Sequence, residues 1–216
     1  MGLAELDEQG RRLIIHSNFI LYGEAASGEL AVEMANDVKA RWEEPRYTVT
    51  VKNKIYLVEF DIKGYYAPSL VPETVFENDD PRNNYFRVEE YASGDISFVD
   101  GIRSNTGYFK SGNLLNGSST AAHEYGHTLG LEHPEVLDIR GKGQPGIMYP
   151  RGTIVDPVFQ YDPSAIPLQP GGTLNPFTRK VTHNELNGLK LSSMYYRNGY
   201  AIVGDFTSIW HEKHLP

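Results

Sequence analysis

Three of the seven histidines in this 216-residue chain lie in one short stretch, HEYGHTLGLEH, which runs from His123 to His133. His123 and His127 are four residues apart, so on a helix their side chains lie on the same face. Gly130 can end this helix in a left-handed conformation, and the chain can then turn back and present His133. Three imidazoles leave one open position on a tetrahedral zinc ion, which is typical of a catalytic site.

Glu124 follows His123 directly, which places its carboxylate at the flank of the histidine pair instead of at the metal. A zinc ion lowers the pKa of a water in its open position to about 7, and it polarises a carbonyl oxygen. Glu124 can take the proton of that water and pass it to a leaving amine. The stretch therefore predicts hydrolysis of peptide bonds, with Glu124 as the catalytic base.

The five fixed residues of the pattern H-E-x-x-H-x-x-G-x-x-H make a specific signal. A chain of this composition contains them by chance in roughly one case in 20,000. A helix with exposed or satisfied histidines, and Gly130 as a simple cap, is therefore disfavoured. The sequence predicts one catalytic zinc ion bound by His123, His127 and His133.

HEYGHTLGLEH matches in full the signature of the metzincin clan of zinc-dependent endopeptidases, and a second stretch resembles the same clan. Met148 lies in GIMYP, which is similar to the methionine turn of metzincins. The resemblance implies that Met148 forms an apolar floor under the zinc ion. It also favours a secreted or exported protein, although this chain shows no signal peptide, and the localisation stays open.

The specific resemblance covers about residues 118–150 and mixes two families of the clan. Pro134 follows the third histidine, as in serralysins, whereas Met148-Tyr149-Pro150 resembles matrixins. Pro150 stands where astacins and serralysins have a zinc-side tyrosine, so Tyr149 is expected to line or support a substrate pocket instead. Phe159 and Tyr161 are further aromatic residues that could shape this pocket. The calcium repeats of serralysins and the cysteine switch of matrixins are both missing.

Two alternative functions stay open. One is a zinc peptidase of gluzincin type, in which a distant glutamate replaces His133 as a ligand, and Glu185 is the plausible candidate for it. The other is a zinc-bound module that binds peptide without cutting it, although no residue of the motif is altered.

The elements that must position the motif follow from hydrophobic spacing. Alternating or continuous apolar residues predict strands, and Ala31 to Trp42 at helical spacing predict a helix that Ser27 would cap. Thr182 and Glu185 have the spacing of a capping box that opens a last helix, reaching about Tyr196. The expected strands are residues 12–22, 47–51, 55–66, 85–90, 96–99 and 107–110, and the expected helices are 27–44, 118–131 and 182–196.

We expect an α+β fold of metzincin type, in a single catalytic domain over residues 1–216. A mixed twisted sheet with two long helices would form an upper lobe, about residues 12–133. An irregular lower lobe, about 134–216, would end in a helix. Residues 145–176 hold seven of the thirteen prolines, so an ordered loop is expected there. Substrate would add to a sheet edge, for which 85–90 and 107–110 are both candidates.

Other polar residues are expected to have structural roles. His16 alternates within an apolar strand and is predicted to be a satisfied core histidine. His183, at a helix start, is predicted to be a surface or capping residue, and His211 and His214 are predicted to be exposed. Calcium remains possible as a second cation, but the run SGDISFVDG around Asp95 and Asp100 lacks a calcium-loop pattern, which favours a solvated acidic turn.

The composition of the chain limits the classes of partner that the protein can bind. The net charge of −8 and the lack of a basic cluster exclude nucleic acid, and no apolar run is long enough for a membrane span. With no cysteine, a metal must be bound by histidine and carboxylate. We expect a monomer that acts on a protein or peptide. An inhibitor, or a pro-segment that includes Asp7 and Glu8, could hold it latent.

Overall fold

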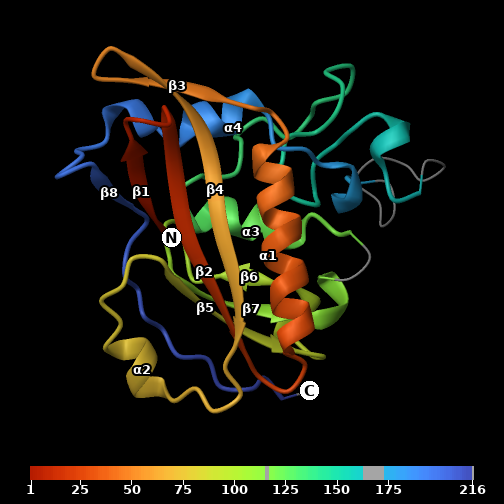
Figure 1. The fold of residues 1–216 in the computed structure, drawn as a ribbon. Helices are drawn as coiled ribbons and strands as arrows, with labels where there is room; N and C mark the ends of the chain where they lie inside the picture. The colour runs from red at the N-terminus through yellow and green to blue at the C-terminus, as the bar shows by residue number, and fades with distance from the viewer. Residues whose placement is uncertain (115–116, 163–172, 216) are drawn as a thin grey trace.

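Strand β2 (Arg12–Tyr22) is the centre of the sheet, as the computed structural model of residues 1–114, 117–162 and 173–215 shows (Figure 1). One edge of β2 pairs in parallel with β4 (Lys54–Tyr66). The other edge is shared, because its first half pairs antiparallel with β1 (Gly2–Asp7) and its second half pairs in parallel with β5 (Asn83–Glu89). The sheet therefore divides into two arms beside β2.

Four short strands extend the sheet further on both sides of β2. β3 (Thr48–Val51) pairs antiparallel with β4, and β8 (Tyr200–Val203) pairs antiparallel with β1. β7 (Thr106–Lys110) pairs in parallel with β5, and β6 (Phe98–Val99) pairs antiparallel with β7. The predicted mixed sheet is confirmed, but the two proposed substrate edges are not edges. β5 and β7 both lie inside the sheet, and β6 ends this arm.

Helix α1 (Gly28–Glu43) covers one face of the sheet, against β4 (Figure 1). It begins as predicted, because the Ser27 side chain accepts a hydrogen bond from the Leu30 N–H at 3.1 Å. Its buried face is the predicted one: Ala31, Met34, Ala35, Val38 and Trp42. A short helix that the sequence did not suggest, α2 (Pro72–Phe76), follows β4.

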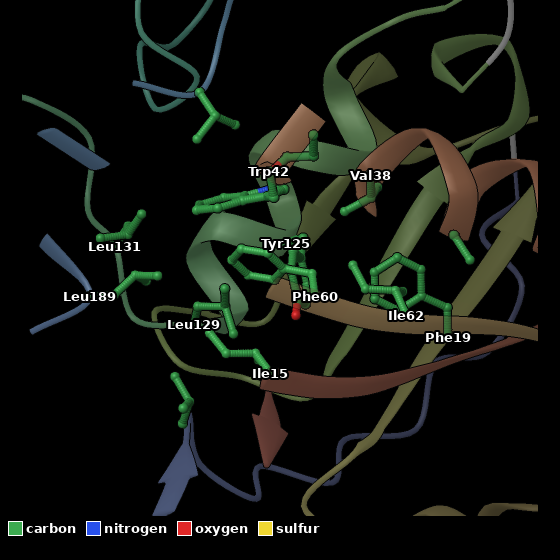
Figure 2. Close-up of a cluster of buried hydrophobic side chains, with 14 of the residues drawn as sticks. Ile15, Phe19, Val38, Trp42, Phe60, Ile62, Tyr125, Leu129, Leu131 and Leu189 are labelled. Carbon is green, nitrogen blue, oxygen red and sulfur yellow. The ribbon is translucent and has the colours of Figure 1, made fainter. Parts of the chain in front are cut away.

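The main core lies between α1, the sheet and helix α3 (Thr120–Thr128), and Tyr125 is at its centre (Figure 2). The Tyr125 ring makes edge-on contacts with Phe19, Trp42 and Phe60, at centroid distances of 5.3, 5.8 and 6.3 Å. Its hydroxyl forms a hydrogen bond with Ser17 Oγ at 2.7 Å. The helix that carries two of the histidines is thus fixed from behind by buried side chains.

The chain after His133 is mostly irregular, as predicted. In the described part of residues 145–176, regular structure is a 3₁₀ turn (Pro157–Phe159) and isolated β-bridges; residues 163–172 of the predicted loop lie outside the described ranges. A second, small apolar cluster is formed here by Ile139, Val155 and Leu174.

The predicted last helix is too long. The capping box of Thr182 and Glu185 is present, but α4 (His183–Gly188) ends after six residues. Lys190 has a left-handed φ of 53°, which redirects the chain into a 3₁₀ turn (Leu191–Ser193). The lower lobe also does not end in a helix, because β8 returns to the sheet.

The N-terminal segment differs from expectation as well. Residues 2–7 belong to the sheet as β1, so the boundary of the upper lobe at residue 12 is too late. Asp7 forms an ion pair with Arg12, and Glu8 forms one with Lys54, so both acidic residues have partners in the fold itself. No helix within the described ranges is long and apolar enough to cross a bilayer.

Candidate metal centre

Helix α3 places His123 and His127 on one face, and its residues 121–128 are all buried. The helix is shorter than the predicted range of 118–131 because it ends at Thr128, just before Gly130. Gly130 has a φ of +101°, and its N–H donates to the His127 carbonyl at 3.0 Å. This is the left-handed turn that the sequence predicted, and it brings His133 back to the helix.

The three Nε2 atoms of His123, His127 and His133 converge on one point. The Nε2 atom of His133 lies 3.0 Å from those of both other histidines, which are themselves 3.2 Å apart. Three nitrogens bound to one tetrahedral zinc at 2.0–2.1 Å are roughly 3.3 Å apart, so the observed triangle is close to that of a metal site. Within the described ranges, this is the one group of histidines and carboxylates close enough to hold an ion.

Backbone carbonyls fix which nitrogen of each helical histidine faces the centre. Nδ1 of His123 donates to the Ile147 carbonyl at 2.7 Å, and Nδ1 of His127 donates to the Leu131 carbonyl at 2.7 Å. A carbonyl only accepts, so the proton of each neutral ring is on Nδ1 and the lone pair is on Nε2. Converging lone pairs repel one another unless a cation lies between them. The residues present therefore fit a bound metal ion.

Burial keeps these rings neutral. It lowers the pKa of His127 to about 4 and lowers that of His123 well below its usual value, while the exposed His133 is shifted in the same direction. Neutral imidazole is the form that binds a metal. The exposed position of His133 leaves the centre open toward solvent on one side.

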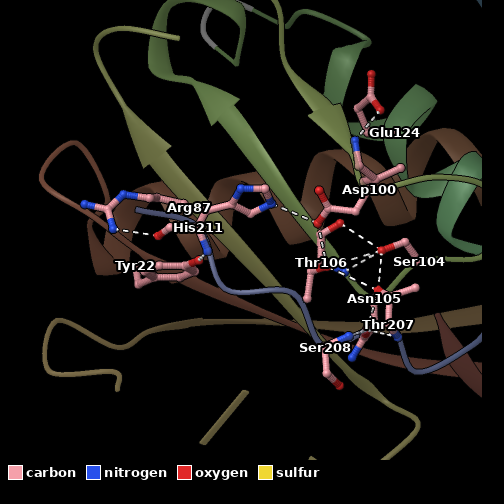
Figure 3. Close-up of polar contacts among 11 residues, drawn as sticks. Tyr22, Arg87, Asp100, Ser104, Asn105, Thr106, Glu124, Thr207, Ser208 and His211 are labelled. Atoms are coloured by element: carbon pink, nitrogen blue, oxygen red, sulfur yellow. Dashed lines mark hydrogen bonds and ion pairs between the residues drawn. The ribbon is translucent and has the colours of Figure 1, made fainter. Parts of the chain in front are cut away.

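Glu124 is buried beside the histidines, and its Oε2 atom accepts a hydrogen bond from the Val99 N–H at 3.2 Å (Figure 3). Burial raises the pKa of Glu124 to about 8, against the opposing effects of the Arg179 charge and this hydrogen bond. The edge strand β6 thus orients the carboxylate. A carboxyl group with such a raised pKa, next to a metal centre, suits the transfer of protons near neutral pH.

Met148 lies against helix α3 and is 2% exposed. Its sulfur packs against the backbone of Gly126, in the turn between His123 and His127. The turn that carries Met148 also supplies the Ile147 carbonyl that orients His123. The turn that carries Met148 therefore supports the histidine cluster both by packing and through a hydrogen bond.

A cleft of about 330 Å³ opens beside the centre, and its lining includes His123, Glu124 and His133. Tyr161 lines it, as the sequence suggested, with Arg151 above its ring. Tyr149 does not line the cleft with its side chain, which packs against the small apolar cluster, as does that of Phe159, and neither is among the described lining residues.

Arg179 also lines this cleft, although the sequence did not suggest it. It is 4% exposed, and burial lowers its pKa to about 10, so it stays charged at neutral pH. Its local sequence, FTRKV, is that of an ordinary polar segment, and only the tertiary fold reveals that the side chain is buried.

The remaining histidines and Glu185 lie outside the centre. Glu185 accepts the Thr182 N–H at 2.9 Å in its capping box, which does not favour the gluzincin ligand set. His183 is exposed, as predicted, and bonds to the Pro45 carbonyl. His16 is half-buried between Glu5 and Asp61 rather than in the core.

His211 and His214 are packed, not exposed, which corrects the prediction for the C-terminal tail. His211 Nε2 lies 2.8 Å from Asp100, whose carboxylate also accepts from the Thr106 hydroxyl (Figure 3). The His214 ring stacks on Tyr108 at a centroid distance of 3.9 Å. Asp95 forms an ion pair with Lys110. Both aspartates considered for calcium therefore have partners within the protein.

No model of a known protein family matches the chain, and a search of curated proteins finds no match either. The assignment of function therefore depends on the geometry of the site and on the motif.

Proposed function

We propose that this protein is a zinc-dependent metallo-endopeptidase of metzincin type. The observation that supports this most directly is the convergence of three Nε2 lone pairs beside a buried carboxylate, at the wall of an open cleft. His123, His127 and His133 would hold the ion. When bound there, zinc supplies Lewis acidity, which makes water more acidic and polarises a carbonyl group.

The protein's own residues perform the remaining tasks. Glu124 takes a proton from the attacking water and returns it to the amine that leaves, and the Val99 N–H holds its carboxylate in place. Ile147 and Leu131 present the imidazoles through their carbonyl groups. The cleft beside the histidines receives the substrate. The carbonyl carbon gains oxygen from water as the C–N bond breaks, so the products are a carboxylate and an amine.

The decisive experiment compares the zinc-loaded protein with its Glu124→Gln variant on a proteome-derived peptide library, each with and without a chelator. We expect cleavage by the wild type that the chelator abolishes. The variant should keep one zinc ion per chain, because Glu124 is not a ligand, and should cut at least about 100-fold more slowly.

The alternatives give different results. If the wild type binds zinc but cleaves no peptide, the function that remains is that of a non-catalytic peptide-binding module. Loss of zinc on Glu185→Ala, but not on His133→Ala, would establish the gluzincin ligand set. Undiminished cleavage by Glu124→Gln would overturn the role of Glu124.

A further inference from the structure

Arg179 connects two parts of the metal centre through neutral groups. Its Nε donates to Ser119 Oγ at 2.9 Å, and its Nη1 donates to the Tyr149 carbonyl at 3.0 Å. Ser119 is the N-cap residue of α3, and Tyr149 follows Met148. These contacts hold the guanidinium in place, but neither acceptor carries a negative charge.

No ion pair joins Arg179 to a carboxylate anywhere in the described ranges, although the side chain is almost fully buried. Among the charged groups that act on Arg179, the leading one is the carboxylate of Glu124, which the proposed reaction requires for proton transfer. A buried charge without a counter-ion is costly, and proteins normally pair it. Arg87 is a second largely buried arginine, and in contrast to Arg179 it forms a 2.7 Å ion pair with Glu89.

The unpaired charge faces the substrate cleft. Arg179 lines the same cavity as His123, Glu124 and His133. A substrate whose scissile carbonyl lies at the metal centre must place a neighbouring group in this cavity. A planar guanidinium with several donors recognises carboxylates well, because two parallel N–H···O bonds form.

Arg151 also lines the cleft, but its environment is different. Its side chain is exposed, and its guanidinium lies over the Tyr161 ring, 5.6 Å from the centroid. An anion bound to Arg151 would remain in water, where the attraction is screened. Arg179 is therefore the better anion-binding group, and Arg151 is its matched control.

We propose that Arg179 determines specificity by binding a substrate carboxylate next to the scissile bond. This inference rests on the proposed peptidase function. The carboxylate can belong to an Asp or Glu side chain within the peptide or to a free C-terminus, and both present the same chemistry to the guanidinium.

Two measurements test this. In the first, wild type, Arg179→Gln, Arg179→Lys and Arg151→Gln are incubated with random peptide libraries whose C-termini are either free or amidated, and the residues beside each cut are counted. In the second, zinc-loaded Glu124→Gln, with and without Arg179→Gln, captures peptides from the same libraries. Capture needs no turnover, so it reports on recognition even if no peptide is cut.

We expect Asp or Glu next to the cut in the amidated library. In a matched pair of peptides that differ only by Glu or Gln at this position, the Glu peptide should be cut about 10- to 100-fold faster. Arg179→Gln should abolish this ratio, Arg179→Lys should keep part of it, and Arg151→Gln should leave it unchanged. A general loss of stability would slow both peptides equally, so the ratio separates recognition from folding.

Each other outcome is decisive. Cleavage only next to free C-termini would assign the carboxylate to the chain end. Cleavage without an acidic preference, or a preference that survives Arg179→Gln or disappears with Arg151→Gln, would overturn the inference while the peptidase function stands. Capture of acidic peptides without any cleavage would support the inference and overturn the peptidase function. Neither cleavage nor acidic capture would overturn both.

Discussion

The sulfur of Met148 occupies the space where a β-carbon on Gly126 would lie. Glycine at this position of α3 therefore permits the turn that carries Met148 to pack directly against the helix backbone, in the turn between His123 and His127. This contact links the two halves of the motif, HEYGHTLGLEH and GIMYP, through a shared surface.

Gly126→Ala should destabilise the protein by about 1 kcal/mol, because the new methyl group overlaps the sulfur of Met148, a buried side chain that must move to make room. The zinc affinity should fall as well, since the turn that carries Met148 also orients His123. Urea unfolding and metal titration measure both effects. Gly28→Ala, at an open position in α1, is the control and should be nearly neutral; equal effects of the two substitutions would contradict the packing argument.

Met148→Ala should cost about 2–5 kcal/mol on its own, because it leaves a cavity. In the Gly126→Ala background it should cost clearly less, since the truncation also removes the overlap. A double-mutant cycle of unfolding free energies measures this coupling. Strictly additive effects would show that the two residues do not share the space.

His123→Ala and His133→Ala should each weaken zinc binding by at least about tenfold, measured by competition with a chelating dye. Glu185→Ala should leave zinc affinity unchanged. It should instead lower stability by about 1 kcal/mol, because it removes one side of the capping box of α4. Equal metal affinity of the His133→Ala variant and the wild type would remove His133 from the ligand set.

In the metal-free protein, the contribution of His127 to stability should decline as the pH falls. Burial lowers the pKa of His127 from 6.5 to about 4, so between these values the unfolded chain binds a proton at this residue that the folded chain does not. The contribution is complete above pH 6.5 and declines toward pH 4. From about pH 7.5 to about pH 5 the His127 contribution should fall by about 2 kcal/mol, while the raised pKa of Glu124 acts in the opposite direction. The His127 contribution is therefore measured as the difference between wild type and His127→Gln in urea unfolding with chelator, and a difference that does not change with pH would contradict the assignment.

His211→Ala should destabilise the protein by about 1–2 kcal/mol, because Asp100 would keep only the Thr106 hydroxyl as a side-chain partner. Thermal or urea unfolding measures the loss. His183→Ala is the matched control: this exposed histidine bonds one carbonyl, and its loss should change stability by less than about 0.5 kcal/mol. Equal losses of stability in the two variants would mean that the contact between His211 and Asp100 does not stabilise the fold.

The sequence predicted the elements whose signal is local. β2 and α1 follow from apolar spacing and from the Ser27 cap, and the metal centre follows from the fixed spacing of His123 and His127 with the turn at Gly130. Interactions between distant segments left no such signal. β8 is a short strand that pairs only with β1 among the described residues, a strand near the opposite end of the sequence.

The cleft shows the same division. Glu124 was predicted from its place in the motif, because the regular geometry of a helix fixes where a residue lies relative to its neighbours in the sequence. Arg179 was not predicted, because its burial depends on Ser119 and Tyr149, which are 60 and 30 residues away in the chain. The side chain of Tyr149 was not placed by the sequence for a related reason: its backbone adjoins the centre, but its side chain packs against the small apolar cluster.

The pairing of β1 with β8 also sets the order in which the molecule can be completed. Glu5 and Tyr200 contact each other across 195 positions of the chain. Closing so long a loop costs entropy before any pairing energy is gained, so this is a late step of folding. A nascent chain that has emerged beyond His133 already carries all three histidines on an unfinished sheet. Completion of the sheet therefore depends on residues 200–203, which the ribosome makes well after the three histidines.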